Sequence, residues 1–175
     1  VMPAYYDLWY QATGDSFWSE AAAAAQAYWQ ATAHPTTGLM PERAYFDGTV
    51  VSGHESFNTE CLRIFFNMAL DRIWTGGEPW LADQGNRLLE FFYGKGLTAY
   101  GYAYSLDGST TVNPLHDTAL IAANGTLALV ATNDLRRDFV SEVWNQSIPT
   151  GGGRYYPGIT LLTALVILSG QMRVY

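Results

Sequence analysis

Seven stretches of the chain repeat apolar residues at the three- and four-residue spacing of an α-helix, and this pattern limits the fold more than any other feature. The spacing predicts helices over residues 3–13, 17–33, 58–74, 79–93, 118–131, 135–145 and 159–170. No stretch alternates apolar and polar residues clearly enough to predict a strand. The chain is therefore expected to be all-α.

The connections between these helices are either short turns or long loops. Short turns near residues 14, 76 and 133 join successive helices into hairpins, whereas residues 34–56, 94–117 and 147–158 form long loops that contain Gly and Pro. Helical hairpins bury their apolar faces by stacking around a common core, which gathers the long loops at one end. Binding and catalytic residues are commonly carried by such loops.

Composition and charge exclude several classes of function. With 49% hydrophobic and 14% charged residues the chain resembles a globular domain, and it has no apolar run of the roughly 20 residues that cross a bilayer. Its net charge of −7, with only 9 basic residues, offers no surface for phosphates. We expect one soluble domain, with neither nucleic acid nor a membrane as a partner.

Cysteine and histidine usage argues against a metal centre. Cys61 is the only cysteine, which excludes an internal disulfide and a cysteine-based zinc site, and it is expected to be a buried structural thiol. His34, His54 and His116 lie far apart in the sequence and lack the spacing of metal-binding motifs. No metal ion is therefore expected.

Aromatic residues are unusually frequent, at 15% of the chain. Many of them stand beside turns and not within the periodic apolar stretches. Flat rings with a polar edge suit the stacking of sugars. The alternative is that these rings close the core.

Glu60 and Arg63 lie one turn apart at the start of the third predicted helix. The positive end of the helix dipole and the neighbouring guanidinium both favour an ionised carboxylate here, which suits a general base. An ordinary surface ion pair would give the same sequence pattern. The two residues by themselves leave both interpretations open.

Five stretches, taken in order, resemble the C-terminal half of glycoside hydrolase family 8: PAYYDLWYQATGDSFWSEAAAAAQAYW, HPTTGLMPERAYFDGT, NTECLRIFFNMALD, NPLHDTALIAAN and GRYYPGITLLTALVILSGQMRVY. The most specific is the Arg-Tyr-Tyr that precedes an apolar helix ending in Leu-Ser-Gly. The nearest likeness is to the branch that releases xylose from the reducing end of xylo-oligosaccharides.

This resemblance implies an (α/α)6 toroid of helical hairpins, of which residues 1–175 supply the C-terminal half of the catalytic domain. It also implies inverting hydrolysis of β-1,4-xylosidic bonds, in which one carboxylic acid protonates the leaving oxygen and a second carboxylate activates water. The acid of the family lies in the N-terminal half, so the expected partners are that half and a xylo-oligosaccharide. The chemistry requires no metal or organic cofactor, and the fragment alone is expected to be inactive.

The resemblance places Glu60 where the family carries the aspartate that acts as general base, and it retains Arg63. Glutamate is one methylene longer than aspartate, and a displacement of about 1 Å can cost on the order of a hundredfold in rate. Either a shifted loop compensates, or another acid such as Glu55 or Asp47 is the base, or the protein is weak or inactive.

Four further residues are implied to line the substrate cleft. Tyr6 matches a tyrosine near the cleaved bond, and either Tyr155 or Tyr156 would stack on or hydrogen-bond a sugar. His116 matches the histidine of a Leu-His-Pro loop that contacts the terminal sugar in the xylose-releasing branch. Asp117 replaces the proline here, which leaves the exo preference open.

Two alternatives to the xylose-releasing activity stay open. One is an endo-acting β-1,4-xylanase or β-1,4-glucanase of the same family, and the other is a sugar-binding toroid that has lost catalysis. The xylose-releasing branch would favour a cytoplasmic location and an endo-acting enzyme a secreted one, so the sequence leaves the compartment open.

Overall fold

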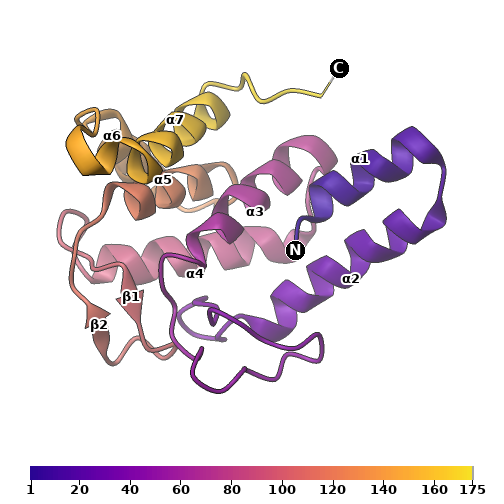
Figure 1. The fold of residues 1–175 in the computed structure, drawn as a ribbon, viewed down its shortest axis with the longest axis horizontal. Helices are drawn as coiled ribbons and strands as arrows, with labels where there is room; N and C mark the ends of the chain where they lie inside the picture. The colour runs from indigo at the N-terminus through magenta and orange to yellow at the C-terminus, as the bar shows by residue number, and fades with distance from the viewer. Residues whose placement is uncertain (175) are drawn as a thin grey trace.

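The computed structural model describes residues 1–174 and is mostly helical in this part of the chain (Figure 1). The helices are α1 (Pro3–Thr13), α2 (Ser16–Thr32), α3 (Leu62–Thr75), α4 (Pro79–Gly94), α5 (Thr118–Thr126), α6 (Arg136–Trp144) and α7 (Tyr156–Leu168). Two short 3-10 helices, η1 (Leu127–Leu129) and η2 (Gly151–Arg154), extend α5 and precede α7. Each of the seven predicted helices is confirmed.

The prediction of no strand is wrong. Two short strands, β1 (Ala103–Tyr104) and β2 (Thr111–Asn113), pair antiparallel within the long loop before α5. Strands of two and three residues are too short to show an alternating pattern in the sequence. Asp107 caps the turn between them by accepting hydrogen bonds from the Ser105 hydroxyl and the Ser109 amide.

Helix ends follow local chemistry. Gly14 ends α1 in the left-handed conformation, and the Asp15 carboxylate caps α2 by accepting from the Phe17 amide. The predicted start of the third helix near residue 58 is too early, because α3 begins at Leu62. Residues 58–61 form a turn instead, in which the Asn58 side chain accepts from a backbone amide.

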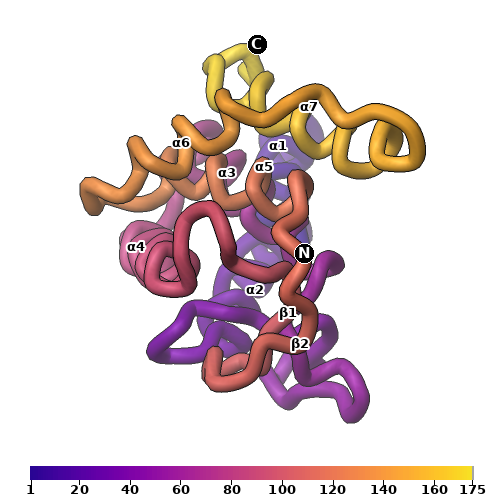
Figure 2. Tube along the Cα trace, turned by 90° about the vertical axis from the view of Figure 1, so that its left-hand side faces the viewer, coloured from indigo at the N-terminus to yellow at the C-terminus, as the bar shows by residue number. Residues whose placement is uncertain are grey.

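The helices form two layers. Helices α1, α3, α5 and α7 lie next to one another in that order and run in the same direction (Figure 1). Helices α2 and α4 return in the opposite direction (Figure 1), and with α6 they form an outer layer, of which Figure 2 shows α4 end-on and α6 from the side. Every inner helix therefore begins at the same end of the molecule.

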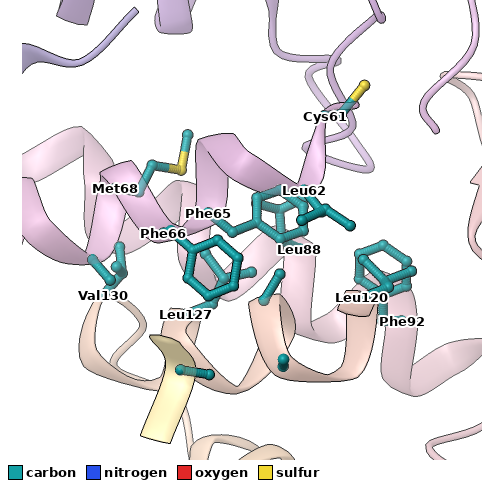
Figure 3. Packing of buried hydrophobic residues seen from close by; sticks show 14 of the residues in the cluster. Cys61, Leu62, Phe65, Phe66, Met68, Leu88, Phe92, Leu120, Leu127 and Val130 are labelled. Atoms are coloured by element: carbon teal, nitrogen blue, oxygen red, sulfur yellow. The ribbon is translucent and has the colours of Figure 1, made fainter. Parts of the chain in front are cut away.

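The core lies mainly between α3, α4 and α5. Figure 3 shows its buried residues Leu62, Phe65, Phe66, Leu88, Phe92, Leu120 and Leu127. The ring of Phe65 stacks on Phe57 with a centroid separation of 5.7 Å, and Phe57 also lies 5.8 Å from Phe92. Phe57 precedes α3, so the same cluster anchors both the helix and the loop that leads into it.

Two of the long loops meet at the end where the inner helices begin, as predicted. The backbones of Phe57 and Tyr104 exchange hydrogen bonds of 2.9 and 3.0 Å, and the Thr37 hydroxyl donates to the Leu106 carbonyl at 2.6 Å. Across residues 1–174, no helix is both long and apolar enough to traverse a bilayer.

Glycine at position 125 allows α5 and α6 to approach closely. A Cβ atom at Gly125 would overlap the Cγ2 atom of Val143, which is buried in α6. Val143 is β-branched and has little freedom to move aside. The α5–α6 contact therefore depends on the absence of a side chain at Gly125.

We expect Gly125→Ala to lower the free energy of unfolding by about 1–3 kcal/mol, because it overpacks this contact. Gly94→Ala is the matched control, since a Cβ atom there would meet no atom within 4 Å, and better helix propensity should make it neutral or slightly stabilising. Urea denaturation of both variants measures the difference. Equal effects would contradict the close packing.

Candidate functional site

Glu60 stands on the turn that leads into α3, at the end where the long loops meet. Its side chain is 56% exposed and forms an ion pair with the Arg63 guanidinium, which is 59% exposed. Arg63 also donates to the Glu60 carbonyl at 3.4 Å. The structure thus brings together the two residues that were predicted to act together, and it leaves the carboxylate accessible to water.

The other acid on this side of α3 is in a different environment. Asp71 is completely buried, and its carboxylate accepts from Gln26 of α2 at 3.1 Å and from the Thr75 hydroxyl at 3.3 Å. Burial raises the pKa of Asp71 above its ordinary value. It joins two helices and has no access to a substrate.

Glu55 and Asp47 both cap turns inside the loop before α3. The Glu55 carboxylate accepts from the Gly53 amide at 2.8 Å, and Asp47 accepts from the Thr49 amide at 2.9 Å. These backbone hydrogen bonds lower the pKa of each carboxyl. Glu60 is the one of the three acids that stands at the start of an inner helix.

The three predicted tyrosines lie in two places. The Tyr6 ring is half-buried, and its centroid lies 5.5 Å from the ring centroid of Trp9 and 6.1 Å from that of Trp18 in α2. Tyr156 is the first residue of α7 and Tyr155 is its N-cap; Tyr155 is 76% exposed, whereas Tyr156 is 38% exposed. Of this pair, Tyr155 presents the ring with more free surface for stacking on a sugar.

His116 is held within a polar network between the loop and α6. Its Nδ1 lies 2.8 Å from the Tyr100 carbonyl oxygen, and its Nε2 lies 2.9 Å from Glu142 Oε1. The Tyr100 hydroxyl donates to Glu142 Oε2 at 2.9 Å. His116 was predicted to contact a sugar, but both of its ring nitrogens already have partners inside the protein.

The hydrogen-bond partners decide where the protons of this network lie. A carbonyl oxygen can only accept, so the Nδ1 atom of His116 must donate. The contact of 2.9 Å between Nε2 and Glu142 Oε1 then requires one further proton, because two lone pairs at this distance would repel each other. Burial raises the pKa of the Glu142 carboxyl, which favours retention of this proton.

Glu142 was not predicted from the sequence, although a signal was present. Phe139 and Val143 are the buried apolar residues of α6, and Glu142 follows Phe139 by three positions on the same face. An acid on the buried face of a helix requires a partner. Glu42 and Asn58, which contact each other beside the turn that carries Glu60, were missed as well.

Cys61 is buried, as predicted, and burial raises the pKa of its thiol to about 12. A thiol with this pKa is unreactive at neutral pH. Among residues 1–174, no group of three or more His, Cys, Asp or Glu side chains is arranged to hold a metal ion.

A cavity of about 560 Å³ lies between α6 and the end of α7, remote from Glu60 in the sequence and lined by Trp144 and Leu168 among others.

We expect Glu142→Leu to lower the free energy of unfolding by about 1–3 kcal/mol, because it leaves the Nε2 atom of His116 and the Tyr100 hydroxyl without a partner. Glu142→Gln should retain most of the stability, since its amide can donate to Nε2 and accept from the hydroxyl. Chemical denaturation at neutral pH checks both values. A leucine variant as stable as the wild type would contradict the role of the network.

The same network predicts a pH dependence. Because the folded-state pKa of Glu142 is raised, its contribution to stability is complete below the ordinary pKa of glutamate and is lost as pH rises through the folded value. As pH rises above the ordinary pKa of glutamate, the stability of the wild type should therefore fall relative to that of Glu142→Gln. Parallel curves for the two proteins would contradict the raised pKa.

Comparison with known proteins extends these observations. No protein-family model matches the chain. The chain is 35% identical over 99% of its length to the reducing-end xylose-releasing exo-oligoxylanase Rex8A of Paenibacillus barcinonensis, and 36% identical over 99% to a reducing end xylose-releasing exo-oligoxylanase of Halalkalibacterium halodurans. It spans 48% and 46% of these proteins, so it is about half their length.

Comparison with solved structures likewise matches nearly the whole chain to about half of a longer protein. A crystal structure of a GH8 xylobiose complex from Teredinibacter turnerae matches 98% of this chain and 45% of its own with a TM-score of 0.90 at 31% identity. The predicted fold class is confirmed: the two helical layers are about half of an (α/α)6 toroid. In sequence and in fold, the chain matches about half of a family 8 glycoside hydrolase and lies close to the reducing-end xylose-releasing exo-oligoxylanases.

Proposed function

We propose that the protein to which this chain contributes about half hydrolyses β-1,4-xylosidic bonds in xylo-oligosaccharides with inversion and releases xylose from the reducing end. The observation that carries the proposal is the likeness to two exo-oligoxylanases over 99% of the chain. The accessible Glu60–Arg63 pair at the start of an inner helix adds a chemical reason.

In this proposal Glu60 is the general base. Its carboxylate removes a proton from a water molecule as the water oxygen attacks the anomeric carbon, and the bond to the leaving oxygen breaks on the opposite face. The Arg63 guanidinium is the ion-pair partner of Glu60, and a neighbouring cation favours the ionised carboxylate that a base requires. A carboxylic acid from the remaining part of the protein protonates the leaving oxygen, about 6.5–9.5 Å from the base.

Sugar contacts in this proposal come from the starts of the inner helices. The exposed Tyr155 ring offers a stacking surface at the N-terminus of α7. His116 has both nitrogens engaged, so a sugar would meet an edge of its ring or the neighbouring Leu115, which is 56% exposed. Tyr6 would contribute to the cleft indirectly, because its ring packs against Trp9 of α1 and Trp18 of α2.

We expect Glu60→Gln in the intact protein to reduce the rate of xylose release from xylotriose by about two to four orders of magnitude, because the amide cannot accept the proton from water. Glu20→Gln is the matched control, an exposed glutamate on α2, and should leave the rate unchanged. An equally active Glu60→Gln protein would show that another carboxylate is the base, and Glu55 and Asp47 would be tested next.

An endo-acting xylanase or glucanase is the second candidate, favoured by one residue. Asp117 replaces the proline of the family loop and caps α5 by accepting from the Ala119 amide at 2.8 Å. The product profile of the intact protein on xylotriose and xylan separates the two. Free xylose from short oligomers supports the exo activity, mixed oligomers from polymer support the endo activity, and binding without turnover indicates a sugar-binding protein.

The remaining half of the toroid is the proposed partner of this chain. Apolar side chains are exposed on both flanks of the inner layer, with Ile159 at 52% and Leu162 at 62% on α7, and Trp9 at 39% and Tyr10 at 43% on α1. Exposed apolar patches of this kind mark surfaces that are covered in the complete protein. The missing helices would cover both flanks and close the ring.

We expect the isolated 175-residue chain to dimerise or aggregate, because its apolar flanks lack their cover. Light scattering over a concentration series measures this. Co-expression with the complementary half should restore a species with the mass of one complete toroid. A chain that stays monomeric at all concentrations would contradict the assignment of these flanks to an interior interface.

A further inference from the structure

The turn that carries Glu60 is held mainly by the Asn58 side chain, and the Cys61 sulfur also accepts from the Asn58 backbone amide at 3.4 Å. Asn58 Oδ1 accepts from the Glu60 amide at 2.9 Å, and the Asn58 carbonyl accepts from the Cys61 amide at 2.9 Å. These two bonds fix the backbone of residues 58–61 as an Asx turn before α3. The direction in which the Glu60 side chain leaves the backbone is set by this turn.

The Asn58 amide is itself oriented by a carboxylate. Asn58 Nδ2 donates to Glu42 Oε2 at 2.8 Å. An ionised carboxylate can only accept, so it selects the NH2 group of the amide and leaves the oxygen for the Glu60 amide. The hydrogen bond from Asn58 is also the main cause of a lowered pKa at Glu42, which keeps the acceptor ionised.

Glu42 is in turn held from its own loop. Its Oε1 atom lies 3.0 Å from His54 Nδ1 and 3.6 Å from Arg43 Nε, and its amide donates to the Ser56 carbonyl at 3.0 Å. The side chain of Glu42 is only 20% exposed, whereas that of Glu60 is 56% exposed. A carboxylate with several partners thus supports a more exposed one through the Asn58 amide.

We propose that Glu42 and Asn58 are positioning residues that place the Glu60 carboxylate for proton transfer. This inference rests on the proposed function, in which Glu60 is the general base. Positioning matters here because Glu60 has one methylene more than the aspartate of the family and therefore more conformational freedom. A misplacement of about 1 Å can cost on the order of a hundredfold in rate, so the orientation of the turn limits turnover.

Glu42 orients Asn58, and Asn58 holds the turn that carries Glu60; we call this series of contacts the relay. Exchanging the charge between positions 42 and 58 tests the relay in the intact protein. Asn58→Asp keeps an acceptor for the Glu60 amide but places a carboxylate against Glu42, and we expect kcat on xylotriose to fall by about 10- to 100-fold with KM changed by less than about threefold. Adding Glu42→Gln restores the relay, because the Gln amide donates to the new carboxylate. The double variant should recover kcat to within about threefold of the wild type.

Two further proteins make the result decisive. Asn86→Asp is the matched control, since Asn86 also caps backbone amides, those of Thr132 and Asn133 beyond η1, and should leave kcat unchanged. Asn58→Ala removes the cap without adding charge and should lower kcat as well. A thermal unfolding curve for each variant shows that it is folded.

The outcomes separate the relay from the proposed function. The relay is overturned if Asn58→Asp and Asn58→Ala turn over as fast as the wild type, or if the double variant is as slow as Asn58→Asp. The proposed function is overturned independently if the wild type releases no xylose from xylotriose, and the assignment of Glu60 as the general base is overturned if Glu60→Gln is fully active, whatever the Asn58 variants do. Loss of activity in Glu60→Gln together with rescue in the double variant supports both.

Discussion

The stacking of Phe65 on Phe57, with Phe92 of α4 beside both rings, is the contact on which the rest of the structure depends. All three side chains are almost completely buried, and aromatic burial of this size dominates the energy of a small core. Phe57 belongs to the loop and Phe65 to α3. The same apolar cluster that holds the helix therefore also fixes the start of the helix and the turn that carries Glu60.

The polar contacts at this end of the molecule form around that apolar cluster. Phe57 exchanges backbone hydrogen bonds with Tyr104, which places the two long loops side by side. On one side of this junction Glu42 supports Asn58, and on the other Glu142 supports His116. In both pairs a carboxylate with little exposure orients a neutral or basic side chain on a loop, which reduces the entropy that the loop retains.

The distribution of apolar surface agrees with a chain that forms part of a ring. The inner layer buries its residues between α1, α3, α5 and α7 but exposes apolar side chains at both of its flanks, on α1 and α7. Glu60 consequently lies on a surface that faces solvent. The cavity of about 560 Å³ beside α6 and α7 is lined by other residues. A substrate cleft around Glu60 needs a second wall, which the proposed remaining half would supply.

The sequence by itself determined the helices, because apolar periodicity, capping residues such as Asp15 and stop signals such as Gly14 act over a few residues. It also predicted that Glu60 and Arg63 lie close together, one turn apart, and they do form a pair although Glu60 lies on the turn before α3. Only the tertiary structure decided the two short strands, the burial of Asp71 and the partners of Asn58 and His116. Apart from the pairing of the two strands with each other, these depend on contacts between residues 16 to 47 positions apart, such as Glu42 with Asn58 and Phe57 with Tyr104, and no local pattern records such distances.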